Sequence, residues 1–474
     1  MGDTWRNWAR TAQCRPREVL RPTSEDELVR AVRGAAALGR EVAGGAAGRR
    51  EVDGVADRLK AAEGAAGRRE VGGAAGRREV GGAGRLKVAG SGHSFSPIAC
   101  TDGRLVDLSG YRRLLSADPD SGLVTVQAGM TLAELGERLA GYGLAMPNLG
   151  DVAYQSVAGA VSTGTHGTGI RLGNLSTTIA GLRLITGDGS ILDCSPASNA
   201  ELFGPARIGL GALGVISTIT LRAVPAFNLH AVEEPVRLNR LLASLDELID
   251  GNDHFEFFWF PATEYALAKR NNRTEGPAKP RGRVGAWVDD IVLQNAALGL
   301  ACRAARAWPP AARVLHEVVP RLGRTEYSDA SHRVFPSPRL VRFTELEYAV
   351  PRAAFAEAFD RLRRLAGEFG PRAFFPWECR FVAGDDIALS PAFGRDSAYI
   401  AVQLYQGIPY ERFYRDVERV FDDYGGRPHW GKLHFQTAGT LRERYPRWAD
   451  FQAARRLTDP HGLFANDHLV RILG

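Results

Sequence analysis

The chain has 474 residues, of which 45% are hydrophobic and 24% are charged, and it carries a formal net charge of +6. This length exceeds what one ordinary core accommodates, so we expect at least two domains in a globular protein of normal composition. The net charge is small for the length, and no basic segment is interleaved with aromatic residues, so nucleic acid is not an expected partner.

The cysteines and the apolar runs indicate the cellular compartment of the protein. The five cysteines are scattered and form no Cys-x-x-Cys pair, which argues against a zinc site or a disulfide framework and favours a reducing compartment. The first residues show no apolar signal segment, and no run approaches the ~20 apolar residues that cross a bilayer. We expect a cytoplasmic protein; peripheral contact of the apolar stretch 296–312 with a membrane is the alternative.

A short repeat interrupts the N-terminal part of the chain. The octet Gly45–Val52 returns at Gly64–Val71 and Gly73–Val80 and decays at Gly82–Val88. These units are rich in Gly, Ala and Arg and have almost no apolar side chain to bury, so they cannot offset the entropy of ordering. We predict that residues 41–85 form a flexible low-complexity insertion.

The segments on either side of the insertion belong to one unit. Pro22–Glu27 has the composition of a helix N-cap and leads into Leu28–Val32 with helical spacing, which predicts a helix. Leu86–Ala89 has the pattern of a short strand. Without residues 41–85 this helix and strand would follow each other directly in the sequence. The repeat is therefore an insertion into a structural unit that is complete without it.

Strands and turns dominate the next part of the chain. Apolar runs and alternation predict strands, a threonine cap predicts a helix start, and Gly187-Asp188-Gly189 predicts a hairpin. In chain order the elements are strands Leu105–Leu108 and Leu123–Gln127, helix Thr131–Tyr142, hairpin strands Leu182–Thr186 and Ile191–Cys194, and strand Leu213–Leu221. Pro225 then marks a domain boundary.

The second half mixes both kinds of element. The same patterns predict strands Phe255–Phe260, Arg342–Ala349 and Tyr399–Leu404, and helices Arg352–Leu365 and Tyr410–Asp423. The predicted fold class is therefore α+β.

Two runs of small residues have the composition of a cofactor site. The first is Gly90-Ser91-Gly92-His93-Ser94, where glycines let a ligand approach the backbone and successive N–H groups can cradle phosphate. Phe95 breaks the G-x-G-x-x-G pattern, which argues against a Rossmann loop. The second run, Ser156–Gly169, is dense in hydroxyls and glycines. Each run alone is compatible with an ordinary turn, but the two together favour a large phosphate-bearing ligand.

Two charged motifs follow in the second half. Glu378 and Arg380 are separated by one residue, so in a strand both side chains point to the same side. The aromatic flanks Phe374–Trp377 and Phe381 indicate burial rather than a surface ion pair, and a buried charge pair usually has a task. His429-Trp430-Gly431-Lys432 places a lysine where it could present a cation to an anionic group; a surface turn is the alternative.

Taken together, these residues resemble the vanillyl-alcohol-oxidase-type FAD enzymes. Lys87–Phe95 is similar to their flavin-attachment loop, and Ser156–Gly169 is similar to their second FAD-binding run. Arg427–Lys432 and Asp459–Asn466 are similar to the sugar-lactone branch, which includes L-gulono-1,4-lactone dehydrogenases, D-arabinono-1,4-lactone oxidases and the related alditol oxidases. The resemblance covers nearly the whole chain apart from residues 41–85.

The resemblance implies a two-part N-terminal FAD-binding domain of the PCMH type and a C-terminal α+β substrate domain with an antiparallel sheet over the flavin. We place the first domain at residues 1–225 and the second at residues 226–474, with the segment from about 455 to 474 returning to the FAD-binding domain. The implied activity is oxidation of a sugar 1,4-lactone of the L-gulono or D-arabinono type by hydride transfer to FAD N5. Oxygen or a redox acceptor such as a cytochrome would take the electrons.

The resemblance also implies roles for individual residues. His93 is at the position of covalent FAD attachment. Further cofactor contacts are implied for Gly90, Ser91, Gly92, Ser94, Phe95, Gly150, Ser156, Gly159, Thr163, His166, Gly167 and Ile216. Glu378, Arg380 and Lys432 are implied to be catalytic and, together with Asp151 and Gln403, to bind substrate. Arg380 would stabilise alkoxide character on the substrate, Lys432 would stabilise charge at flavin N1/C2=O, and Gly150 would leave room for oxygen.

Three alternatives stay open. The first is an alditol oxidase that makes hydrogen peroxide from a linear polyol, which Asp151 and Gln403 disfavour. The second is a non-catalytic flavin-binding protein, which the joint presence of the charged motifs disfavours. The third is a metal-dependent enzyme that uses His93, His166 and His429; no metal is expected, because no second ligand stands at metal spacing beside His93.

Overall fold

The computed structural model describes residues 4–41, 84–261, 263–282, 298–308, 323–337 and 341–474. The flexible insertion predicted at residues 41–85 falls on residues 42–83, which lie outside this part of the chain. The helix predicted to start after Pro22 is present and covers residues 25–41. Of the apolar stretch 296–312, the structure describes residues 298–308, which include helix α8 (Leu298–Ala307).

The first half of the chain forms two sheets that pack on one apolar core. The smaller sheet is parallel, with strand order β3 (Glu18–Leu20), β5 (Arg104–Asp107), β4 (Leu86–Ala89). The larger sheet is antiparallel, with order β10 (Ile191–Cys194), β9 (Ile179–Ile185), β11 (Val215–Arg222), β7 (Leu123–Gln127), β6 (Leu114–Ala117). Helices α2 (Leu132–Ala140), α3 (Val157–Ser162) and α4 (Ala200–Ala206) and the strand pairs β1 (Trp5–Arg6) with β2 (Gln13–Cys14) and β8 (Leu144–Ala145) with β12 (Val224–Pro225) complete this half.

Local chemistry explains where these elements begin and end. The predicted strand Leu86–Ala89 is confirmed residue for residue. Helix α2 begins after Thr131, whose hydroxyl and Glu134 form a capping box, as the predicted threonine cap requires. The strand predicted from Leu213 begins instead at Val215, because Gly214 has a φ of 150° and a Cβ there would lie 2.6 Å from the carbonyl oxygen of Ile185.

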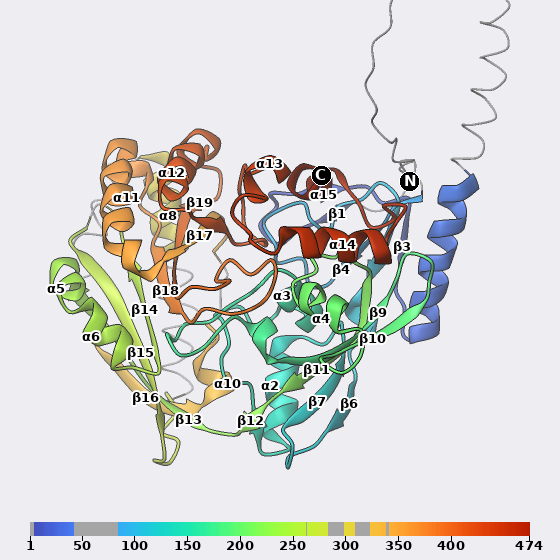
Figure 1. The fold of residues 1–474 in the computed structure, drawn as a ribbon. Coiled ribbons are helices and arrows are strands. Elements are labelled where there is room, and N and C mark those ends of the chain that lie inside the picture. Colours follow the sequence, from blue (N-terminus) through green and yellow to red (C-terminus); the bar gives the residue numbers. More distant parts are fainter. Residues whose placement is uncertain (1–3, 42–83, 262, 283–297, 309–322, 338–340) are drawn as a thin grey trace, which may run out of the picture.

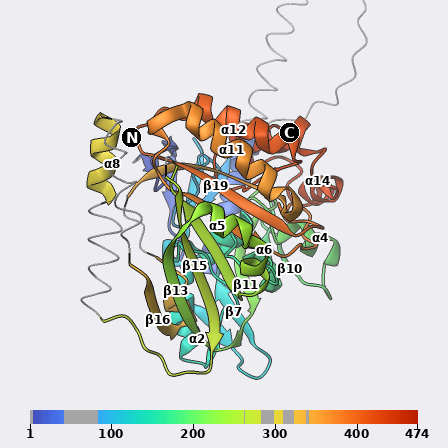
Figure 2. The same cartoon turned by 90° about the vertical axis from the view of Figure 1, so that its left-hand side faces the viewer.

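The second half is built on one antiparallel sheet of eight strands (Figures 1 and 2). The strand order is β16 (Thr325–Ala330), β13 (Asn228–Arg237), β15 (Tyr265–Thr274), β14 (His254–Trp259), β18 (Trp377–Val382), β19 (Ser397–Tyr405), β17 (Phe343–Pro351), β20 (Arg427–Pro428). Helices α5 (Leu238–Ala243), α6 (Leu245–Asp250), α11 (Phe355–Phe369) and α12 (Glu411–Asp423) cover one face of it, and α10 (Ser331–Val334) and α13 (Ala438–Leu441) are short. The predicted α+β class is confirmed.

The two faces of the eight-stranded sheet differ in chemistry. Phe257, Cys379 and Ile400 lie in the apolar core that the sheet shares with the helices. Side chains alternate along a strand, so their neighbours Glu256 and Arg380 project from the opposite face. These neighbours are also buried, with 3% and 7% of their surface exposed. The sheet therefore carries a buried charged face opposite its apolar face.

The C-terminal segment packs on the first half of the chain. Helices α14 (Trp448–Thr458) and α15 (Asp467–Leu473), red in Figure 1, lie near β4. Leu86 N donates to the carbonyl oxygen of Leu463 at 2.9 Å, and Lys87 Nζ donates to that of Phe464 at 3.0 Å. Asn466 Nδ2 reaches the carbonyl oxygens of Pro97, Ile98 and Cys100 at 2.8 to 3.1 Å. The tail thus braces the loop that follows β4.

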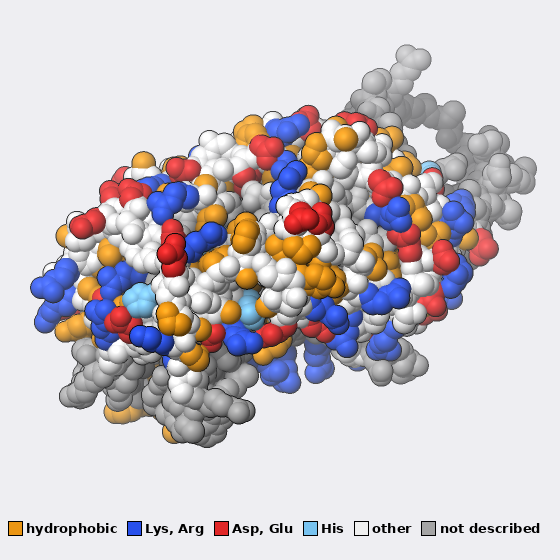
Figure 3. All heavy atoms as spheres, turned by 90° about the horizontal axis from the view of Figure 1, so that it is seen from below, with side chains coloured by type: hydrophobic (Ala, Val, Ile, Leu, Met, Phe, Trp, Pro, Cys, Tyr) orange, Lys and Arg blue, Asp and Glu red, His pale blue; other side chains and the backbone are white. Residues whose placement is uncertain are grey.

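The surface of the described residues seen in Figure 3 has no large patch of positive or of negative charge alone. Lysine and arginine side chains are interspersed with aspartate and glutamate over this face. Among the described residues, no helix is both long enough and apolar enough to cross a membrane.

The contacts of Asn466 generate a stability prediction. Asn466→Ala removes the donor for three carbonyl groups and also the cap that Oδ1 provides to Leu469 N at 2.8 Å. We expect a loss of about 2–3 kcal/mol of unfolding free energy, measured by urea denaturation. Asn239→Ala, at an exposed position on α5, is the control and should change it by less than about 0.5 kcal/mol. Equal losses in both variants would contradict the bracing role.

Candidate active site

The glycine loop after β4 is held from three sides. Gly90 has no room for a side chain, because a Cβ there would overlap the hydroxyl of Ser156, the first residue of the second small-residue run. Gly92 has a φ of 69°, and its carbonyl accepts a hydrogen bond from Trp8 N at 2.8 Å. Phe95 N donates to the carbonyl oxygen of Gly431 at 2.7 Å. The loop therefore joins the N-terminal strands, the second run and the lysine motif.

The two small-residue runs line one cavity of about 120 Å³. Nine of the predicted cofactor-binding residues lie in its wall: Gly90, Ser91, Gly92, His93, Ser94, Ser156, Gly159, Thr163 and Ile216. The wall combines glycine backbone, hydroxyl groups and an apolar side, which suits a cofactor that has both phosphates and ring systems. These residues fit FAD.

A second cavity, of about 350 Å³, lies between the glycine loop and the charged face of the eight-stranded sheet. The predicted residues in its wall are His93, Ser94, Phe95, Gly150, Asp151, Thr163, His166, Glu378, Arg380, Gln403 and Lys432. Four residues line both cavities: His93, Ser94, Gln155 and Thr163. Gly167 lines neither; a Cβ on it would overlap Asn148 and the Leu149 carbonyl, so close packing accounts for this glycine.

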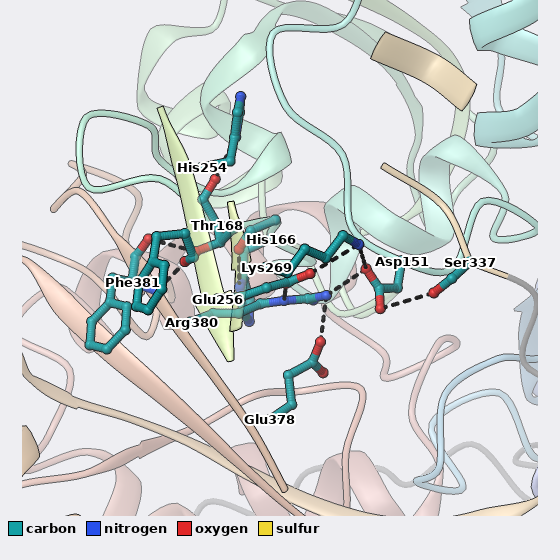
Figure 4. A network of polar contacts seen from close by, with 12 residues as sticks. Asp151, His166, Thr168, His254, Glu256, Lys269, Ser337, Glu378, Arg380 and Phe381 are labelled. Carbon is teal, nitrogen blue, oxygen red and sulfur yellow. Dashed lines mark hydrogen bonds and ion pairs between the residues drawn. The ribbon is translucent and has the colours of Figure 1, made fainter. Parts of the chain in front are cut away.

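Arg380 is surrounded by carboxylates (Figure 4). Its Nη2 lies 2.6 Å from Glu378 Oε1 and 2.9 Å from Asp151 Oδ1, and its Nε donates to Glu256 Oε2 at 2.6 Å. Burial works against the charged form, but the three carboxylates outweigh it and raise the pKa of Arg380 well above its ordinary value. The structure thus brings Glu378, Arg380 and Asp151 together and places a permanent cation at the cavity.

Lys432, another residue of this cavity wall, is held in the same way. Its Nζ forms an ion pair with Glu345, lies 3.6 Å from Glu347 Oε2, and stands 5.1 Å from the centre of the Phe95 ring. Burial works to lower the pKa of Lys432, but Glu345 and Glu347 raise it above its ordinary value. Lys432 is therefore a charged ammonium held by carboxylates in a cavity wall, and it is not part of a surface turn.

His93 stands where the two cavities meet. Its ring lies 5.9 Å from that of Trp8 in a stacked arrangement. Burial, with a further contribution from the charge of Lys432, lowers the pKa of His93 to about 4. The imidazole is therefore neutral at neutral pH, with a ring nitrogen that can act as a nucleophile.

The histidine grouping differs from the one that the metal alternative required. His166 and His429 come together with Glu347, within 4.8 Å, and His93 is not in that group. The ring nitrogens of His166 face the Gly167 carbonyl at 2.8 Å and Glu347 Oε1 at 3.2 Å, so His166 bridges the second run to β17. The Lys432 ammonium beside Glu347 disfavours a divalent cation at this place.

Sequence reasoning missed four charged members of the site. Glu345 and Glu347 lie on β17, Glu256 on β14 and Lys269 on β15. Glu256, Glu345 and Glu347 stand among apolar and aromatic residues, and that departure from the pattern was the available signal; Lys269 begins a polar stretch of its strand and gave no such signal. Their partners lie on other strands, so the pattern could not reveal what they bind.

Comparison with family models assigns both halves of the chain. Residues 219–472 match the model described as D-arabinono-1,4-lactone oxidase, and residues 83–195 match an FAD binding domain.

Curated relatives match over most or all of their length. The chain is 41% identical to the L-gulono-1,4-lactone dehydrogenase of Mycobacterium tuberculosis, over 100% of both chains. It is 33% identical to the L-gulonolactone oxidase of Bos taurus, over 99% of this chain and 98% of that one. It is 32% identical to the alditol oxidase of a Streptomyces species, over 81% and 89%. Among solved structures, cholesterol oxidase from B. sterolicum has the same fold, with a TM-score of 0.76 at 17% identity over 100% of this chain and 97% of that one.

The buried ring of His429 generates a pH prediction. Burial lowers its pKa to about 3, whereas an unfolded histidine titrates near 6.5. As pH falls below about 6.5 the unfolded chain takes up a proton that the folded chain does not, so stability decreases by about 1.4 kcal/mol per histidine at one unit below that value. His429→Gln should therefore lose less stability than the wild type on acidification, by about that amount.

Urea denaturation at about pH 7.5 and about pH 5.5 measures this difference. The control is His461→Gln, which removes an exposed imidazole and should keep the dependence of the wild type. Glu347, the carboxyl group beside His429, has a pKa far below this pH range and stays ionised, and the other carboxyl groups are common to all three proteins, so they cancel in the comparison. An unchanged pH dependence in His429→Gln would contradict the assignment of a neutral ring.

Proposed function

The chain belongs to the D-arabinono-1,4-lactone oxidase family, and from this premise we propose that it oxidises a CH–OH group of a sugar 1,4-lactone with FAD as cofactor. The observation that carries the proposal is the second cavity. Two cations, Arg380 and Lys432, line it, and it shares His93 with the cavity of the glycine loop.

Arg380 provides the charge that alcohol oxidation needs. When bound, FAD would supply the acceptor for the hydride of the substrate carbon, and the proton of the substrate hydroxyl would pass to water. Negative charge develops on the substrate oxygen as its proton leaves, and the guanidinium of Arg380 stabilises that charge. Glu378 and Asp151 hold Nη2 of Arg380, so the cation is in place before substrate binds and little reorganisation is required.

Lys432 has a separate role in the cavity. We assign its ammonium to stabilising negative charge at N1/C2=O of the cofactor ring. Glu345 and Glu347 fix the ammonium in place, and Phe95 lies beneath it.

Gln403 supplies a polar contact for the substrate. Its Nε2 donates to Glu345 Oε1 at 3.1 Å, which orients the amide. Its Oε1 is buried and has no hydrogen-bond partner among the described residues. A buried acceptor without a donor is costly, and a sugar hydroxyl in the cavity would satisfy it. We therefore assign Gln403, with Asp151, to substrate binding.

The electron acceptor is a separate question. Gly150 was expected to leave room for oxygen, but a Cβ there would lie 2.9 Å from the carbonyl oxygen of His166. Backbone packing accounts for the glycine, so it favours neither oxygen nor a cytochrome. Relatives named as oxidase and as dehydrogenase are both similar to the chain.

Flavin reduction distinguishes a lactone substrate from a polyol substrate. Under anaerobic conditions L-gulono-1,4-lactone should reduce the flavin faster than xylitol, followed by stopped-flow absorbance. Arg380→Ala and Lys432→Met should each slow the reduction by about 10²–10³-fold, because each removes a cation that stabilises developing charge. Arg361→Ala, which removes an ion pair with Asp423 on the helical side, is the control and should reduce normally. Faster reduction by xylitol would favour the alditol oxidase alternative.

The covalent attachment of FAD can be tested at His93. A neutral, nucleophilic ring at the junction of the cavities supports our proposal that His93 carries FAD covalently. After denaturing electrophoresis, the wild type should give a fluorescent flavin band and His93→Ala should give none. His461→Ala, at an exposed loop position, is the control and should retain the band. A fluorescent band in His93→Ala would place the attachment on another residue.

A further inference from the structure

A row of four alternating charges crosses the eight-stranded sheet and ends at Arg380. Glu233 on β13 is directly opposite Lys269 on β15, Lys269 is opposite Glu256 on β14, and Glu256 is opposite Arg380 on β18. Directly opposed residues of antiparallel strands project from the same face. All four therefore lie on the charged face of the sheet, and we call them the charge row.

The contacts within the row are direct. Lys269 Nζ lies 3.2 Å from Glu256 Oε1 and 3.8 Å from Asp151 Oδ1, and Arg380 Nε donates to Glu256 Oε2 at 2.6 Å (Figure 4). Lys269 and Glu256 are 6% and 3% exposed. Glu256 thus uses one oxygen for each cation, and Lys269 connects the two carboxylates that hold Arg380 from different sides.

Lys269 and Glu256 do not line the cavity, whereas Arg380 does. They can therefore affect the substrate only through other residues. Buried ion pairs contribute little net stability, because desolvation offsets their attraction. What these ion pairs do is fix the position of the guanidinium. Glu256 holds it at Nε, while Asp151 and Glu378 hold it at Nη2. Contacts at two nitrogens of a planar group restrict both its position and its orientation.

We propose that Glu256 and Lys269 are positioning residues that act through Arg380, with Lys269 holding Glu256 and Asp151 so that both keep their places against the guanidinium. The inference rests on the function proposed above, because it assumes that Arg380 acts on the substrate. Without Lys269, three carboxylates would surround a single cation, and their mutual repulsion would move Glu256 or Asp151 away from Arg380.

A double-mutant cycle tests the proposal. Glu256→Gln keeps the shape of the side chain and removes its charge, and it should slow anaerobic flavin reduction by L-gulono-1,4-lactone by about 10–100-fold while KM changes by less than about threefold. Lys269→Met should slow it in the same direction. In an Arg380→Ala background, Glu256→Gln should change the rate by less than about twofold, because its route of action is already absent.

Two controls separate positioning from folding. Glu234→Gln breaks a more exposed ion pair with Arg270 on the opposite face of the same sheet and should leave the rate unchanged. Thermal denaturation of every variant reports stability, and calorimetry with L-gulono-1,4-lactone and dithionite-reduced enzyme reports binding without turnover. Glu256→Asp, which keeps the charge on a shorter side chain, should have a rate between those of wild type and Glu256→Gln, and it remains informative if Glu256→Gln fails to fold.

The outcomes are distinguishable. Two results would overturn the positioning role and leave the proposed function intact. In the first, the wild type turns over and Glu256→Gln reduces its flavin at the same rate. In the second, Glu256→Gln lowers the rate of flavin reduction by the same factor in the wild-type and Arg380→Ala backgrounds. A wild-type flavin that neither a sugar lactone nor xylitol reduces overturns the proposed function, and the inference falls with it.

Discussion

Burial of charge on one face of a sheet is the constraint on which the rest of the site depends. A cation removed from water needs anionic or hydrogen-bonding partners, and in this site carboxylates from the strands of the sheet and from the loop at Asp151 provide them. Arg380 meets this requirement through Asp151, Glu256 and Glu378, and Lys432 meets it through Glu345 and Glu347. The apolar face, packed on four helices, keeps these strands in register.

Local patterns were sufficient for most of the fold. The spacing of Glu378 and Arg380 and their aromatic flanks predicted a buried pair on one side of a strand, and β18 confirms it. The strand at Leu86–Ala89 and the cap at Thr131 are likewise set by neighbours in sequence. The boundary between the halves at residue 225 and the roles of individual site residues stay predictions.

Long-range pairing accounts for what sequence reasoning missed. Glu256 stands between two phenylalanines, and nothing within that stretch indicates that Arg380, 124 residues away, lies opposite it. Lys269 and Glu347 are similar cases, since register across strands decides their partners. Gly150 and Gly167 show the converse, because packing against backbone or a neighbouring side chain explains glycines that resemblance assigned to ligands.

The carboxylates that hold the two cations also give the cavity an electrostatic preference. Asp151, Glu345, Glu347 and Glu378 line it beside the cations Arg380 and Lys432, so carboxyl groups outnumber the cations in its wall. A sugar lactone is neutral, whereas the aldonic acid formed when its ring opens is an anion at neutral pH. We expect these carboxyl groups to disfavour the anionic open form relative to the neutral closed ring.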